Sequence, residues 1–88
     1  MVEIQTIIKN RAGIHARPAA MIVQTAGKFK SRIFLQNGDD RINAKSIMGI
    51  ITLGAGFESR IRIIAEGDDE ADAAAAIERL FVNRFEEE

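Results

Sequence analysis

Apolar and polar residues alternate in three separate segments, and this alternation constrains the fold more than any other feature of the sequence. Residues 2–8, 31–36 and 58–65 all show it, most clearly where Ile61 and Ile63 alternate with arginines. A period of two places the apolar side chains of a strand on one face. We therefore expect three strands with one buried face each. A short fourth strand over residues 41–44 should follow the hairpin signal Asn37-Gly38.

Helical periodicity replaces the alternation after the first strand. The apolar residues that recur at helical spacing here are Ala19, Ile22, Val23 and Ala26. We expect this helix to begin at Pro18, because the residue before a proline is disfavoured in the helical conformation. Arg17 would then lie at or beside the N-cap, and Gly27 would end the helix.

Two further helices are predicted from their N-cap residues. Ser46 is a strong N-cap candidate for a brief apolar helix over residues 47–53. Asp68 or Asp69 should cap the last helix. The apolar face of that helix consists of Ala73, Ala74, Ile77, Leu80, Phe81 and Phe85. We expect the three glutamates at 86–88 to form a solvated, frayed terminus.

These elements predict the order βαββαβα in a single domain of residues 1–88. The two longer helices can cover one face of a four-stranded sheet, which gives a two-layer α+β domain. The order of the strands in the sheet stays open, because periodicity shows which face of a strand is buried and not which strands pair.

Composition excludes several classes of function. The chain has no cysteine and one histidine, so we expect neither disulfides nor a metal site, and no cofactor. A formal net charge of −1 argues against a nucleic-acid binder, which normally has a basic face. No segment approaches the ~18 apolar residues of a membrane span. The N-terminus also lacks the basic and apolar regions of a signal peptide, so we expect a cytoplasmic protein without membrane insertion.

The one histidine, His15, lies in a segment suited to holding a phosphate. Its imidazole is the side chain that is partly neutral, and so nucleophilic, near neutral pH. Arg17 offers a planar fork of donors to phosphate oxygens, and the start of a helix offers backbone N–H groups without partners. Each feature alone is ordinary. Their combination at one helix start predicts an anion or phosphoryl site in which His15 can act as the nucleophile.

The segment from Lys45 to Ile51 is unusually apolar for a short helix that follows a cap. Ile47, Met48 and Ile51 cannot all be buried by so few turns. One interpretation is a core helix in which Met48 fills a gap. The other is a docking patch for a partner protein, with Ser46 as a site of modification at its edge.

With both motifs, the sequence resembles the HPr family, the histidine-containing phosphocarriers of the bacterial phosphoenolpyruvate-dependent sugar phosphotransferase system. Gly13-Ile14-His15-Ala16-Arg17-Pro18-Ala19 corresponds to the active-site motif of the family, and Lys45-Ser46-Ile47-Met48-Gly49 to its regulatory motif. The resemblance extends over nearly the whole chain at matching spacing. It implies an open-faced β-sandwich, in which a four-stranded antiparallel sheet carries helices on one side.

The resemblance also implies a role for each motif. His15 would accept a phosphoryl group on Nδ1 from phosphorylated enzyme I and pass it to the IIA domain of a sugar permease. Arg17 and the backbone N–H groups of Ala16 and Arg17 would hold the phosphate. Ser46 would be modified by the HPr kinase/phosphorylase, and a transcriptional regulator is a further expected partner. The protein would be a monomeric carrier and not an enzyme. The expected docking residues are Ala16, Ala20, Ile47, Met48 and Ile51.

An alternative is a regulatory binding module whose output is phosphorylation-dependent protein binding. It could belong to the nitrogen-regulatory branch, which residues 10–13 and 79–86 resemble although the serine motif does not. It could also be a corepressor of carbon catabolite genes, but the related non-carrier branch lacks the histidine that this chain has at position 15. Ala12 departs from the small polar residue that many sugar-type members carry beside the histidine.

Overall fold

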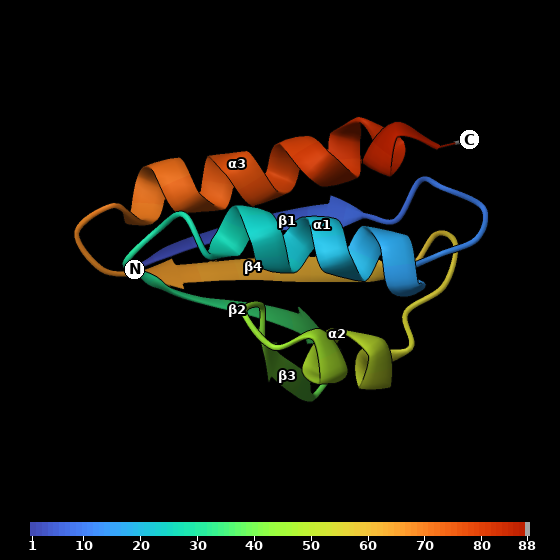
Figure 1. Cartoon of the computed structure of the whole chain (residues 1–88). Coiled ribbons are helices and arrows are strands. Elements are labelled where there is room, and N and C mark those ends of the chain that lie inside the picture. Colours follow the sequence, from blue (N-terminus) through green and yellow to red (C-terminus); the bar gives the residue numbers. More distant parts are fainter. Residues whose placement is uncertain (88) are drawn as a thin grey trace.

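Four antiparallel strands form one sheet, and three helices cover one of its faces (Figure 1). The strands are β1 (Val2–Ile7), β2 (Arg32–Asn37), β3 (Asp40–Asn43) and β4 (Arg60–Glu66). The helices are α1 (Ala16–Ala26), α2 (Ile47–Leu53) and α3 (Glu70–Val82), and a short 3-10 turn, η1 (Arg84–Glu86), follows α3. This computed structural model describes residues 1–87. The predicted α+β class and the order βαββαβα are confirmed.

The strands lie in the order β1-β4-β2-β3, so the last strand of the chain is central in the sheet. Ile63 of β4 is paired with Ile4 on one side and with Leu35 on the other. All three side chains point to the face that the helices cover, and Leu35 and Ile63 have no exposed surface. The alternation that predicted the strands is therefore the pattern by which the sheet builds its half of the core.

The helices supply the other half of the core from one stripe each. The stripe of α1 includes Ala19, Ile22 and Ala26, and that of α3 includes Ala73, Ala74, Ile77 and Phe81. All seven side chains are buried, because helical spacing brings them to the side that faces the sheet. Among the described residues, no helix has the length and apolar character to cross a bilayer.

The start of α1 differs from the prediction. The helix begins at Ala16 with His15 as the N-cap, so Arg17 lies inside the first turn instead of at the N-cap. Pro18 is the third helical residue, where its missing N–H has no acceptor within the helix in any case. Gly27 ends the helix as predicted, but with φ −64° it does so without the left-handed conformation that a glycine cap commonly adopts.

Asp69 is the N-cap of α3, but its side chain does not cap that helix. Its carboxylate instead accepts hydrogen bonds from the backbone N–H groups of Lys30 and Ser31, both at 2.9 Å, and from the Ser31 hydroxyl. These contacts, led by the bond from the Ser31 hydroxyl, lower the pKa of Asp69 to about 2. Asp69 thus joins the start of α3 to the segment before β2, which is why β2 begins at Arg32 and not at Ser31.

Candidate functional site

His15 is held at the surface by a loop that is itself fixed in place. Gly13 has φ +72°, a conformation that favours glycine, and lies against the backbone of Ala55 and Gly56. The next residue, Ile14, is buried and donates its N–H to the Ala55 carbonyl at 3.0 Å. The side chain of His15 then points outward and is 44% exposed. The burial of Ile14 and the close packing of Gly13 therefore hold the imidazole of His15 at the surface.

The first turn of α1 lies directly after the imidazole. His15 is the N-cap residue, so the N–H groups of Ala16 and Arg17 have no acceptor within the helix. In this described turn there is no acidic side chain, so the positive end of the helix dipole is not offset from within the turn. The N-cap is therefore His15 itself, two residues before the N-cap at Arg17 that a helix start at Pro18 implies. The backbone N–H groups predicted to hold a phosphate follow the histidine directly.

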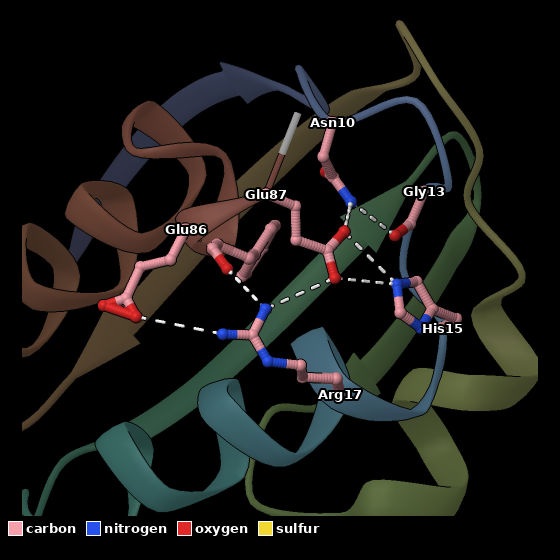
Figure 2. A network of polar contacts seen from close by, with 7 residues as sticks. Asn10, Gly13, His15, Arg17, Glu86 and Glu87 are labelled. Atoms are coloured by element: carbon pink, nitrogen blue, oxygen red, sulfur yellow. Dashed lines mark hydrogen bonds and ion pairs between the residues drawn. The ribbon is translucent and has the colours of Figure 1, made fainter.

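A carboxylate from the C-terminus occupies the other side of the ring (Figure 2). Nε2 of His15 lies 3.0 Å from Oε2 and 3.2 Å from Oε1 of Glu87. The Glu87 side chain is only 19% exposed, so the prediction of a solvated, frayed terminus is wrong for this residue. Glu86 fits the prediction better, with a side chain that is 71% exposed, and Glu88 lies outside the described residues.

Asn10 completes this network, although the sequence analysis gave its side chain no role. The residue has no exposed surface, and its Nδ2 donates to the Gly13 carbonyl at 2.7 Å and to Glu87 Oε1 at 3.1 Å. Both partners are acceptors, so the NH₂ end of the amide must face them. The sequence signal that could have pointed to this amide is an asparagine three residues before a glycine in a turn, because asparagine side chains commonly hydrogen-bond to nearby backbone in turns.

The side chain of Arg17 points toward the C-terminal turn. Its guanidinium donates to the Phe85 carbonyl at 3.0 Å and lies 3.4 Å from Glu87 and 3.9 Å from Glu86. Figure 2 shows the Glu87 carboxylate between this guanidinium and the imidazole. The predicted pair of His15 and Arg17 is therefore brought together, but in this structure through Glu87.

An unusual backbone turn brings Glu87 to this place. Arg84, Phe85 and Glu86 have φ of 57°, 53° and 60°, which is a left-handed turn of three residues other than glycine. Such residues are costly and need support from their surroundings. Phe85 supplies it, since its ring is fully buried and meets Phe81 edge-on with 4.9 Å between the ring centroids. Burial of this one ring turns the chain back toward His15.

The short helix α2 presents the second sequence motif. Ser46 is its N-cap, and the hydroxyl oxygen accepts the N–H of Gly49 at 3.1 Å. Ile50 is fully buried, whereas Met48 is 65% exposed and Ile47 and Ile51 are each 42% exposed. Met48 is thus not a filler of the core, and that interpretation is wrong.

The exposed side chains of α2 lie on a helix that packs against α1 (Figure 1). Of the two α1 residues predicted to join them, Ala16 is exposed and Ala20 is half-buried. We call Ala16, Ala20, Ile47, Met48 and Ile51 the apolar patch. An apolar surface of this kind on a small domain is typical of contacts with other proteins.

Comparison with known proteins identifies the family. A family model described as the PTS HPr component phosphorylation site matches residues 2–83, which is nearly the whole chain. The chain belongs to the HPr family. A phosphocarrier protein HPr from Treponema pallidum is 56% identical over 81 residues, which cover 92% of each protein. The HPr-like protein Crh of Halalkalibacterium halodurans is 47% identical over 88% of this chain and 92% of its own length.

The fold agrees with that of solved HPr structures. A crystal structure of HPr from Thermoanaerobacter tengcongensis superposes with a TM-score of 0.95 at 48% identity and covers 100% of this chain and 99% of its own. As an HPr, the chain is a phosphocarrier of the phosphotransferase system, works with the other components of that system and is not an enzyme.

Proposed function

We propose that His15 is the residue that carries the phosphoryl group. It accepts the group on Nδ1 from phosphorylated enzyme I and passes it to the IIA domain of a sugar permease. The observation that carries this proposal is the exposed imidazole at the N-cap of α1, directly before two backbone N–H groups without helical acceptors. Phosphoryl transfer needs positioning and charge stabilisation more than covalent chemistry from the carrier.

Two variants test this assignment, and each serves as the control for the other. The protein is incubated with labelled phosphoenolpyruvate and enzyme I, or with labelled ATP and HPr kinase/phosphorylase. His15→Ala should lose the acid-labile label from enzyme I and keep the label from the kinase. Ser46→Ala should show the reverse. Undiminished enzyme I labelling of a folded His15→Ala would overturn the proposal.

Arg17 supports the phosphate in this scheme by changing its partners. Its guanidinium is half exposed and bound to one carbonyl and to carboxylates, which a phosphate on the neighbouring ring can replace. Removing a donor aimed at developing phosphate charge costs on the order of 2–4 kcal/mol in a closed site, and solvent screening here favours the lower end. Arg17→Ala should therefore fold normally and transfer slowly in a stopped-flow assay with enzyme I.

The apolar patch is proposed as the surface on which enzyme I, the IIA domains and the kinase dock in turn. It lies on α2 and on the first turns of α1, two helices that pack against each other, and His15 is the N-cap of α1, so a partner seated there has His15 at the edge of its footprint. One shared surface suits a carrier that must release one partner before it meets the next.

Ser46 is proposed as the regulatory site at the edge of this patch. A phosphate adds about −1.5 to −2 charges there, and a partner presenting a phosphorylated histidine would be repelled. Ser46→Asp should slow His15 transfer without a change of fold, and rising salt should relieve part of the inhibition because exposed charges are screened. Transfer at the parental rate at low salt would contradict this mechanism.

A second candidate is a regulatory module in which phosphorylation-dependent binding to a transcriptional regulator is the main output. The observation that supports this candidate is the 47% identity to an HPr-like protein Crh. The exposed His15 favours the carrier, and the enzyme I experiment separates the two. The carrier is further proposed to act in the cytoplasm. It is also proposed to be a monomer, which sedimentation of the phosphorylated and free forms would test.

A further inference from the structure

The carboxylate of Glu87 meets one particular nitrogen of His15. Its two oxygens lie 3.0 Å and 3.2 Å from Nε2. An ionised carboxylate only accepts hydrogen bonds, so the ring nitrogen that faces it must carry a hydrogen. A neutral imidazole has one such hydrogen, and Nδ1 is then left with a free lone pair.

Glu87 is itself held in place from three directions. Nδ2 of the buried Asn10 donates to Oε1, and Arg17 approaches Oε2 at 3.4 Å. The ring of Phe85, two residues before Glu87, is buried and fixes the backbone there. Hydrogen bonding with His15, and less strongly with Asn10 and Arg17, lowers the pKa of Glu87, so its carboxyl group is ionised at neutral pH.

We propose that Glu87 is a positioning residue for phosphoryl transfer, which holds His15 in the tautomer with the hydrogen on Nε2 and so leaves Nδ1 as the nucleophile. The inference rests on the proposed function of His15. It assigns a role to a C-terminal side chain that lies 72 residues from the histidine in sequence. A histidine oriented by a carboxylate on its far nitrogen is a familiar arrangement in hydrolases.

The transfer step shows why the carboxylate matters beyond orientation. The Nδ1 lone pair forms the new bond to phosphorus, and the bond between phosphorus and the donor atom of phosphorylated enzyme I breaks, with its electron pair staying on the donor. Nε2 keeps its hydrogen throughout, so the ring gains positive charge as the bond forms. The Glu87 carboxylate, in contact with that N–H, stabilises the developing charge.

The tautomer can be measured without any transfer, by ¹⁵N NMR of the imidazole in the free protein at alkaline pH. The parent should show the hydrogen on Nε2. Glu87→Ala should lose roughly a tenfold bias toward that tautomer, the factor that a hydrogen bond to a charged acceptor supplies. Glu86→Ala removes the same charge one residue earlier without touching His15 and should behave as the parent. Equal tautomer proportions in the parent and in Glu87→Ala would overturn the inference.

Transfer from enzyme I supplies the second measurement. Glu87→Ala should be slower by roughly three- to tenfold. Most of this loss reflects the missing negative charge beside the ring, partly screened by solvent, because a free imidazole in water still favours the hydrogen on Nε2. Glu87→Gln keeps one acceptor oxygen and should fall between the parent and Glu87→Ala. The melting temperatures should agree, which separates this role from a structural one.

The two proposals fail in different ways. Normal labelling of His15 at the parental rate in Glu87→Ala would overturn the role of Glu87 alone. A parent protein that receives no label on His15 would overturn the proposed function, and the role of Glu87 with it.

Discussion

Gly13→Ala should be the most damaging single-methyl substitution in the loop before His15. Gly13 has φ +72°, and a Cβ there would lie 2.9 Å from the Ala55 carbonyl oxygen and 3.0 Å from the Gly56 Cα. Both atoms belong to backbone, so neither can rotate away. Gly38 offers a matched control because it has φ +62° with no atom within 4 Å of the corresponding Cβ.

The two substitutions share one cost and differ in the other. Placing alanine in the left-handed region costs roughly 1–2 kcal/mol at either position. Only Gly13→Ala also forces two backbone segments apart, and overpacking of this kind typically costs about 1–3 kcal/mol more. We therefore expect Gly38→Ala to lose about 1–2 kcal/mol of unfolding free energy and Gly13→Ala about 2–5 kcal/mol.

Urea unfolding followed by circular dichroism measures both losses, and enzyme I labelling of the folded variants reports on the site. The clash pushes residues 13 and 14 away from Ala55 and so strains the hydrogen bond from the Ile14 N–H to the Ala55 carbonyl. Gly13→Ala should therefore also displace His15 and slow its labelling. Gly38→Ala should label at the parental rate. If both variants lose the same free energy, the close approach at Gly13 does not exist in solution and this reasoning is refuted.

Three further predictions concern other elements. Ser46→Ala should lose about 1 kcal/mol in urea unfolding because α2 loses its cap, whereas Ser46→Asp keeps an acceptor and should lose less. Met48→Asp should weaken enzyme I binding in calorimetry without lowering the melting temperature. Val82→Asp, at a similarly exposed position on α3, should leave binding unchanged, and a destabilised Met48→Asp with normal binding would contradict the patch. Asp69 has its pKa lowered from 3.8 to about 2, so the stability it contributes is present above pH ~4 and lost as the pH falls toward 2. Asp69→Asn should reduce the change of the urea midpoint with pH across that range, while Asp68→Asn should keep the pH dependence of the parent.

Local patterns in the sequence were sufficient for most of the fold. The alternation in β1 and β4 follows from a period of two, which depends only on neighbouring residues, and it placed the buried faces correctly. Ser46 predicted α2 over Ile47–Leu53 because capping is an interaction within one turn. The strand ends differ from the prediction by one or two residues, and at Ser31 the reason is a distant group, because the Asp69 carboxylate accepts its backbone N–H.

The start of α1 shows a local rule that tertiary contacts overrode. The restriction before proline predicted a start at Pro18, but the helix begins at Ala16. Ile14 is buried and bonded to Ala55, so the chain enters the helix from a fixed point and Arg17 adopts the helical conformation despite the proline. A packed neighbour outweighs a conformational preference of this size.

Sequence alone predicted a chemistry for His15, Arg17 and Ser46, because each prediction depends on a residue type beside a helix start. Tertiary structure decided which nitrogen of His15 is hydrogen-bonded and where Arg17 points. Both depend on Glu87 and Asn10, which are separated by 77 residues in the chain and lie 3.1 Å apart in space. Patterns of period two or 3.6 carry no information over such a separation. It is the burial of Phe85 in the core that returns Glu87 to the site.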